Sequence, residues 1–385
     1  MVIRKNTTLR DWIPLVEIAT SLGVAAAVIT FGFSQKKSYE DFDLGTGTSS
    51  YFARQNDVTI HTNNPDSTFI EGVEELIANN SKDVLLILGN SQTHGINQFE
   101  AGQTNYIGLA VNRYESQVQV IGHSIPNANL QELYLLFQFW TDRIHVSTLV
   151  LPIFYDDLRE DNVREHFFKY MTSAGLHCRG DSPIATKLNQ CLKSIHQNSS
   201  EQSNSPAVKF ESLQELTELK LNEYLSSQFD IWRNRSTLRG EFEIFRYRLR
   251  NTVFGITPQS KRSVISTIAN DNMQSLEMLL ELAQDLKVEV LLYIPPLRQD
   301  VEPPYDLMQY SEFKEQIQKL SHLYDNVRFL DLDGIVPGQF WGMKDSTNLF
   351  GRSEYDFMHF QYEGHVKLLE ALVPTLDELI YSSDL

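Results

Sequence analysis

Five apolar runs of strand length alternate along this chain with segments whose apolar residues recur at helical spacing. The runs cover residues 84–88, 118–121, 148–154, 288–294 and 327–330. The helical patterns lie near residues 100–114, 128–143, 266–286, 306–323 and 361–381. Continuous apolar strands joined by helical crossovers predict an α/β fold, in which helices cover both faces of a doubly wound parallel sheet. Ligands of such sheets bind beyond the carboxyl ends of the strands.

The alternation stops between about residues 157 and 264, where no run predicts a buried strand. A polar stretch at 196–205 predicts an exposed loop, and residues 213–221 have apolar positions at helical spacing. We interpret the interval as an inserted helical cap, because it leaves the sheet at the carboxyl end of the third strand. A separate helical bundle without a part in the chemistry is the alternative.

An apolar segment near the N-terminus, residues 12–33, is long enough to span a membrane, which takes about 20 such residues. The basic residues Arg4, Lys5 and Arg10 precede it, which favours an N-terminus inside and the bulk of the chain outside the cytoplasm. Glu17 is unfavourable within a bilayer, and a buried helix of a soluble protein is the alternative. The predicted organisation is a cytoplasmic tail at 1–11, an uncleaved transmembrane anchor at 12–33, a linker and N-terminal extension at 34–80, and an α/β domain at 81–385.

The composition narrows the classes of ligand. A net charge of −17 argues against nonspecific binding of nucleic acid, which requires clustered Lys and Arg. The 10 histidines are scattered without close metal-ligand spacing, so we predict no metal site. Cys178 and Cys191 could form a disulfide outside the cytoplasm, or remain two buried thiols.

A serine and an aspartate–histidine pair could carry chemistry at the ligand side of the sheet. Gly89-Asn90-Ser91 ends the first apolar run, so Ser91 lies on the turn that leaves the first strand. Asp356 and His359 lie late in the chain, after the last strand and before the last helical pattern. Together the three side chains can form the triad of a serine hydrolase or acyltransferase.

A second Asp-x-x-His sequence, Asp142 to His145, precedes the third strand and is therefore expected at the amino end of the sheet. This position separates it from Ser91, so we choose Asp356 and His359. We interpret His94 and His365 as structural residues or residues at the edge of the substrate site.

These elements resemble the SGNH (GDSL-type) hydrolases over roughly residues 84–160 and 285–381. Gly89-Asn90-Ser91 is similar to the first sequence block of that family, with Asn90 where Asp is usual, and Asp356-Phe-Met-His359 is similar to the last. The resemblance implies a flavodoxin-like sheet, consistent with the strand order 2-1-3-4-5 that we infer. It also implies a Ser91–His359–Asp356 triad that works without a cofactor.

Two further blocks depart from the family pattern at the oxyanion site. Asn127 stands where a glycine N–H is expected, and Asn tolerates positive φ better than most residues. Asp156 stands where an Asn side chain usually donates to the oxyanion, and an ionised Asp cannot donate. The resemblance therefore implies an oxyanion hole formed mainly by the backbone of Ser91 and Asn127, unless another donor takes part.

The N-terminal anchor and the Asp-x-Met-His sequence look most like the DltD-like branch of the family. That branch is membrane-anchored, faces outward and works beside membrane-bound O-acyltransferases that decorate cell-envelope polymers. The resemblance implies a serine esterase or O-acyltransferase that acts on acyl esters of envelope polysaccharide. Two alternatives remain: a lipid or small-ester hydrolase with the same triad, and a catalytically inactive scaffold, which the departures at Asn127 and Asp156 would explain.

Overall fold

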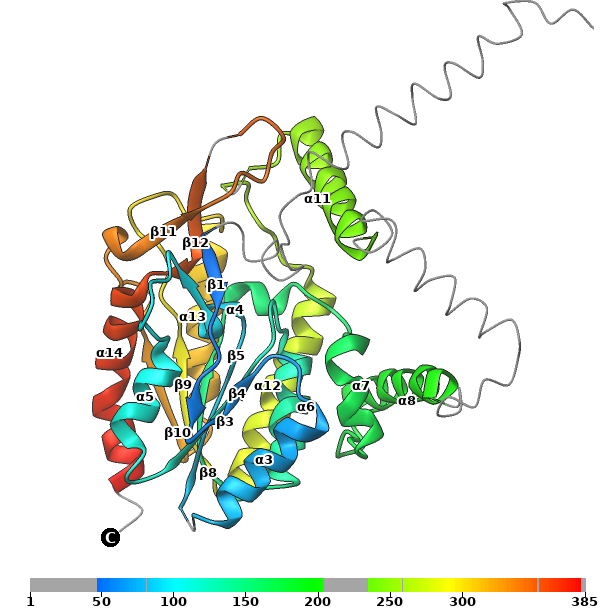
Figure 1. Cartoon of the computed structure of the whole chain (residues 1–385), viewed down its shortest axis with the longest axis vertical. Helices are drawn as coiled ribbons and strands as arrows, with labels where there is room; N and C mark the ends of the chain where they lie inside the picture. The colour runs from blue at the N-terminus through cyan, green and yellow to red at the C-terminus, as the bar shows by residue number, and fades with distance from the viewer. Residues whose placement is uncertain (1–46, 81, 204–234, 258, 352, 382–385) are drawn as a thin grey trace, which may run out of the picture.

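A parallel sheet of 6 strands forms the centre of the molecule, with the strand order β10-β9-β8-β5-β7-β4 (Figure 1). The computed structural model describes residues 47–80, 82–203, 235–257, 259–351 and 353–381. The strands are β4 (His61–Thr62), β5 (Val84–Gly89), β7 (Gln119–Ser124), β8 (Val146–Pro152), β9 (Glu289–Ile294) and β10 (Val327–Asp331). The 5 predicted strands therefore have the order 2-1-3-4-5, and the predicted α/β class with a parallel sheet is confirmed.

Helices cover both faces of this sheet (Figure 1). Helix α5 (Tyr106–Tyr114) packs with α14 (Tyr362–Tyr381) on one face, and α6 (Leu130–Thr141) packs with α12 (Ser266–Asp285) on the other. Helix α3 (Ser67–Ala78) lies beside α6, where the ring of Phe69 meets that of Trp140, and α13 (Leu307–Ser321) packs against β10. Because both faces are covered, every residue of β5 and β7 is buried, which explains why these strands lack polar alternation.

Side-chain caps fix where several of these helices begin. Asn129 accepts from the Glu132 N–H, and the Glu132 carboxylate accepts from the Asn129 N–H, which forms a capping box at the start of α6. The Asn105 and Asp306 side chains accept from the first turns of α5 and α13. Such caps are typically worth about 1 kcal/mol each, and the one at α6 also fixes the loop before it.

The N-terminal extension adds short strands to the body. Strand β4 extends the sheet through its pairing with β7, and β1 (Thr48–Ser50) pairs antiparallel with β6 (Gly95–Asn97). Strands β2 (Arg54–Gln55) and β3 (Val58–Thr59) form a small hairpin between them. The described part of the predicted linker, 47–80, is therefore integrated with the α/β domain. Strands of two or three residues carry no periodic pattern, so the sequence did not predict them.

The insertion between β8 and β9 contains the helices α7 (Glu165–Ser173), α8 (Pro183–Ser203) and α11 (Arg235–Phe254). Helices α7 and α8 pack together, and α8 also contacts α12. Helix α11 instead reaches the loop 345–351, where the Asn251 amide donates to the Thr347 carbonyl over 3.2 Å. The insertion thus divides into a helix pair at the side of the sheet and a helix near its carboxyl end (Figure 1).

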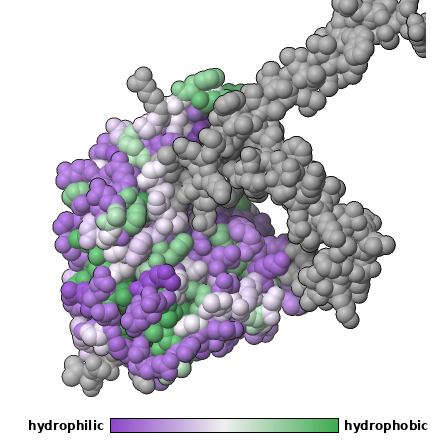
Figure 2. Space-filling view, viewed as in Figure 1, coloured by the Kyte–Doolittle hydropathy of each residue, from purple (hydrophilic) through white to green (hydrophobic). Residues whose placement is uncertain are grey.

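The predicted anchor at residues 12–33 and the tail at 1–11 lie outside the described residues. Within the part of the chain that the structure describes, no helix has both the length and the apolar character needed to cross a membrane. Figure 2 shows mainly hydrophilic residues on the visible described surface. Cys178 and Cys191 are free thiols, so the disulfide that the sequence left open is absent between them.

Four buried histidines lie beneath the carboxyl end of the sheet. The Ser124 hydroxyl bridges His61 Nε2 at 2.7 Å and His94 Nδ1 at 2.8 Å. His123 Nδ1 accepts from Trp140 Nε1 over 3.1 Å, and His365 Nε2 donates to the Gly95 carbonyl over 3.2 Å. Burial lowers the pKa of His94, His123 and His365 to about 3 and that of His61 well below its ordinary 6.5, so all four are neutral near pH 7.

We expect the free energy of unfolding to fall as the pH decreases below 6.5. In the unfolded chain each of these histidines binds a proton near its ordinary pKa of 6.5, whereas the folded state keeps it neutral. Their contribution to the free energy of unfolding is therefore fully present above pH 6.5 and is lost as the pH falls toward 3. Urea unfolding from about pH 8 to about pH 5 measures this slope. His123→Gln should reduce it by about one proton, or ~1.4 kcal/mol per pH unit at most. An unchanged slope would contradict the prediction.

Candidate active site

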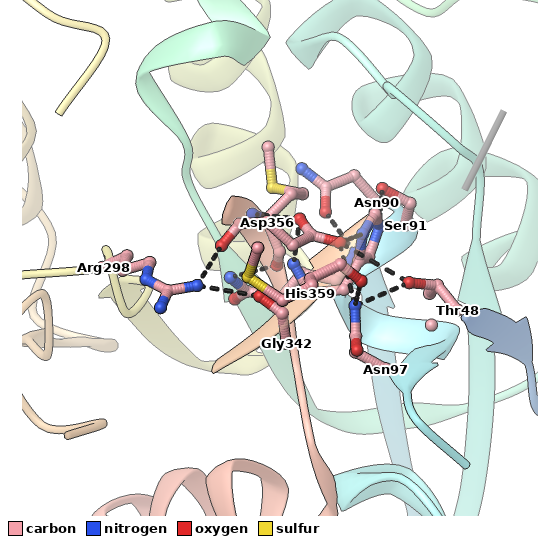
Figure 3. Close-up of polar contacts among 12 residues, drawn as sticks. Thr48, Asn90, Ser91, Asn97, Arg298, Gly342, Asp356 and His359 are labelled. Carbon is pink, nitrogen blue, oxygen red and sulfur yellow. Dashed lines mark hydrogen bonds and ion pairs between the residues drawn. The ribbon is translucent and has the colours of Figure 1, made fainter. Parts of the chain in front are cut away.

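Ser91, His359 and Asp356 form one continuous hydrogen-bonded chain (Figure 3). Ser91 is the first residue of the short helix α4 (Ser91–His94), directly after β5, and its Oγ lies 3.0 Å from His359 Nε2. His359 Nδ1 lies 3.0 Å from Asp356 Oδ2. An ionised carboxylate only accepts, so Nδ1 carries the proton and Nε2 is free to accept from the Ser91 hydroxyl. The structure therefore brings together all three residues that the sequence predicted as a triad.

Asp356 and His359 lie on a bulge in a hairpin, between the last predicted strand and the last predicted helix. Strand β12 (Glu354–Phe360) pairs antiparallel with β11 (Trp341–Lys344). Trp341 pairs with Phe360 and Met343 pairs with Tyr355, so the four residues 356–359 stand opposite the single residue Gly342. A bulge of this kind turns side chains out of the alternating pattern of a strand. Here it directs Asp356 and His359 toward Ser91.

The bulge leaves backbone groups without ladder partners, and side chains from elsewhere satisfy them. Arg298 is buried and its Nη1 donates to the Gly342 carbonyl at 2.8 Å and the Asp356 carbonyl at 3.3 Å. Gln92 Nε2 donates to the Met358 carbonyl at 2.9 Å. Since unpaired buried carbonyls cost folding free energy, these contacts stabilise the bulge and link it to the nucleophile turn. Neither residue is marked by a pattern in the sequence.

The Asp356 carboxylate stays ionised although it is buried. Burial opposes its ionisation, but His359, Lys344 and the Met358 N–H together hold the pKa of Asp356 well below its ordinary value of 3.8. Oδ1 accepts from the N–H groups of Met358 at 2.8 Å and His359 at 3.1 Å. The negative charge that faces His359 therefore persists across the range in which enzymes usually operate.

Asn90 stabilises the turn that carries Ser91 through two side-chain contacts. Its Oδ1 accepts from the Gln92 N–H at 3.0 Å, which caps α4, and its Nδ2 lies 3.4 Å from Asp157 Oδ1. Asp157 also accepts from the Phe154 N–H at 2.9 Å, and burial raises its pKa well above the ordinary value of 3.8. Asn90 is 3% exposed, and it lines the cavity together with Ser91 while it supports the turn that carries Ser91.

The loop that holds Asn127 has the backbone conformation that the sequence suggested. Asn127 has a positive φ of 51°. Arg164 fixes this loop, because its guanidinium donates to the carbonyls of Pro126 at 2.6 Å and Asn127 at 3.2 Å, and it pairs with buried Glu132 at 2.5 Å. Among the described residues, no hydrogen bond occupies the N–H of Ser91 or of Asn127, which leaves both available to a ligand.

Asp156 lines the same cavity as Ser91, but its carboxylate is fully engaged. It accepts from Arg159 Nη1 at 2.7 Å, from Tyr305 Oη at 2.9 Å and from Arg262. Arg159 lies at the start of the insertion and Arg262 lies just before α12, so the shared carboxylate of Asp156 links these two segments. Asp156 therefore acts as the centre of an ion-pair cluster, and it supplies no hydrogen to an oxyanion.

A cavity of about 750 Å³ lies next to Ser91 and His359, a size typical of ligand sites. The insertion between β8 and β9 contributes to its wall. The lining residues from this part of the chain are Asp157, Arg159 and Glu160 at its start, Tyr247, Arg250 and Asn251 of α11, and Ile256, Thr257 and residues 260–263 after it. Lys344 of β11 and Thr347 of the loop after it also line the cavity, and Thr347 adjoins α11 through its contact with Asn251.

The other histidines lie where the sequence argument placed them. His145 is exposed directly before β8, at the amino end of the sheet. His94 and His365 are fully buried and hydrogen-bonded within the core, so both are structural and neither reaches the cavity edge.

Comparisons with known proteins leave the family open. No family model matches the sequence, and no curated protein matches it. The similar solved structures include a candidate platelet activating factor from Streptococcus pneumonia, with a TM-score of 0.35 and 11% identity over 80% of this chain and 91% of that chain. A candidate acylhydrolase from Bacteroides fragilis has a TM-score of 0.36 and 9% identity over 82% and 99%. Axe2, an acetylxylan esterase from Geobacillus stearothermophilus, has a TM-score of 0.35 and 12% identity over 76% and 93%.

Such low scores and identities establish neither a shared fold nor a shared activity. The resemblance to the SGNH hydrolases and to their DltD-like branch remains a prediction from the sequence.

Proposed function

We propose that this protein is a serine esterase or O-acyltransferase of the SGNH type. The observation that carries the proposal is the chain of contacts from Ser91 Oγ to His359 Nε2 and from His359 Nδ1 to Asp356 Oδ2, each 3.0 Å long, on the wall of a cavity. Nucleophile, base and orienting acid are thereby within hydrogen-bond reach of one another.

The proposed reaction proceeds in two steps. His359 Nε2 takes the Ser91 proton while Ser91 Oγ attacks the carbonyl carbon of an ester, and Asp356 stabilises the imidazolium that forms. The imidazolium then protonates the leaving alcohol, and an acyl–Ser91 ester remains. In the second step His359 takes a proton from water or from a sugar hydroxyl, whose oxygen attacks the acyl carbon. The bond from the acyl carbon to Ser91 Oγ then breaks, and the imidazolium returns the proton to Ser91 Oγ.

The backbone N–H groups of Ser91 and Asn127 are the proposed oxyanion donors. The positive φ of Asn127 and the free N–H groups support this role. Removal of one such donor typically costs a hundredfold to a thousandfold in rate, or about 3–4 kcal/mol. The engaged Asp156 carboxylate contributes no donor, which keeps the catalytically inactive scaffold as the second candidate.

The lining of the cavity favours a small acyl group on a polar alcohol. Charged, amide and hydroxyl side chains predominate in the wall, and its aliphatic members are Pro126, Ala128, Ile256 and Met358. A long acyl chain needs an extended apolar channel to gain free energy from burial. We therefore prefer an acyl ester of a carbohydrate, such as a cell-envelope polysaccharide, to a lipid substrate.

The apolar segment 12–33 supports a proposed location at a membrane, with the domain outside the cytoplasm. An anchor would raise the effective concentration of the site near envelope polymers and near a membrane-bound O-acyltransferase as an acyl-donor partner.

Variants of the triad test the chemistry. Ser91→Ala should abolish hydrolysis of p-nitrophenyl acetate, and His359→Ala should slow it by at least about a hundredfold, because the general base is lost. His145→Ala is the matched control and should retain its rate. Steady-state kinetics at saturating ester decide the matter, with circular dichroism to verify folding. Full activity of Ser91→Ala, or a larger loss in the His145 variant, would refute the assignment.

Acyl chain length tests the proposed substrate class. We expect kcat/KM for p-nitrophenyl esters to be highest for acetyl and not to rise toward octanoyl. In an apolar acyl channel each buried methylene would instead contribute up to about 0.8 kcal/mol. A steady increase with chain length would favour the lipid hydrolase.

The location has its own test. Full-length protein should remain in membranes after a carbonate wash, and a C-terminal alkaline phosphatase fusion should be active while a cytoplasm-only reporter is silent. Deletion of residues 1–33 should release the protein. Recovery of the intact chain in the carbonate supernatant would rule out the anchor.

A further inference from the structure

Strand β6 follows the nucleophile helix directly and supports the other two members of the triad. A Cβ at Gly95 would lie 2.8 Å from His359 Cδ2, so the imidazole ring rests against a position that only glycine leaves open. Asn97 lies two residues further along and therefore on the same face of the strand. Its amide reaches the Asp356 carboxylate (Figure 3). The segment from Ser91 to Asn97 thus contacts every group of the proposed triad.

The Asn97 amide is a donor to the acid of the triad. Its Nδ2 lies 3.3 Å from Asp356 Oδ2, 3.0 Å from the Met343 carbonyl and 3.0 Å from Thr48 Oγ1. A carboxylate and a carbonyl only accept hydrogen bonds, so the nitrogen of the amide must face them. Oδ2 is the same oxygen that accepts from His359 Nδ1, so Asn97 fixes the oxygen that orients the base.

Thr48 completes this arrangement from the N-terminal strand. Thr48 is the register partner of Asn97 in the β1–β6 pair, and its hydroxyl lies 3.5 Å from Asp356 Oδ2. Both side chains are buried, with exposures of 4% for Thr48 and 0% for Asn97. Water therefore does not replace them as donors.

Stability does not explain an amide at this position. Asn97 Oδ1 is buried and has no partner among the described residues, which is unfavourable for folding. The facing residue is Gly342, where any Cβ would overlap the Asn97 amide. The site therefore accommodates an amide whose nitrogen donates hydrogen bonds and whose oxygen has no partner among the described residues.

We propose that Asn97 and Thr48 are positioning residues that hold Asp356 Oδ2 toward His359 Nδ1. The inference rests on the proposed hydrolase function and extends it to the N-terminal strand β1, without which the acid would lose one of its donors. Asn97→Leu and Thr48→Val should lower kcat, and the rate at which a fluorophosphonate modifies Ser91, by roughly tenfold to a hundredfold, as expected for hydrogen bonds to a charged group. KM should change little, because neither side chain lines the cavity.

Conservative variants separate positioning from mere packing. Thr48→Ser keeps the hydroxyl and should restore the rate. Asn97→Asp keeps the shape but places a second carboxyl beside Asp356; two such groups share a proton. The rate of this variant relative to the unaltered protein should fall as the pH rises and the added carboxyl ionises. A purely structural role would give a ratio that does not depend on pH.

Matched controls come from the opposite end of the sheet. Asn326 also has a buried Oδ1 without a partner among the described residues, and it donates to the Val288 carbonyl at 2.6 Å. Thr148 is 2% exposed near the amino end of β8. Asn326→Leu and Thr148→Val should destabilise the protein to a similar degree and leave kcat unchanged.

The outcomes distinguish the inference from the function on which it rests. If the unaltered protein is not modified by the fluorophosphonate, the proposed function fails, and the proton NMR signal of His359 Nδ1–H, which needs no turnover, decides the inference. Loss of that signal in Asn97→Leu supports positioning. If the unaltered protein reacts and the folded Asn97 and Thr48 variants react at the same rate, the inference is overturned. Should the larger substitutions fail to fold, Thr48→Ser and the pH dependence of Asn97→Asp decide it.

Discussion

A buried carboxylate determines how this site is built. Asp356 is 1% exposed, and a buried charge without partners costs several kcal/mol. It receives hydrogen bonds from two backbone N–H groups, from His359 Nδ1, and from the side chains of Asn97 and Thr48. The two backbone donors come from its own bulge, so the shape of the bulge and the charge stabilise each other. Arg298 and Gln92 then satisfy the carbonyls that the bulge leaves unpaired.

The sequence predicted the sheet well because its central strands are buried on both faces and read as continuous apolar runs. Position along such a strand also predicted which side chains meet: Ser91 and His359 lie at the carboxyl end, whereas exposed His145 precedes β8 at the other end. The short strands β1, β4 and β6 escaped prediction, since two or three residues define no period. Strand β12 was not predicted either, because its bulge interrupts the alternation of buried and exposed side chains.

The supporting residues of the site were beyond sequence reasoning. Thr48 and Asp356 are separated by 308 positions and Asn97 and Asp356 by 259, and nothing local marks an isolated Thr or Asn as a partner of a distant acid. Arg164 and Arg298 are similar cases, because surface and buried arginines look alike in a sequence. The positive φ of Asn127 was predictable, since Asn is among the few residues that adopt it readily.

The central claim is that Ser91 is the nucleophile of an acyl-transfer reaction, activated through His359 and Asp356. The most direct test is peptide mapping by mass spectrometry after a brief reaction of the full-length protein with a fluorophosphonate. The account predicts a single phosphonyl adduct, on Ser91. No adduct, or an adduct on another serine while Ser91 stays unmodified, would contradict it.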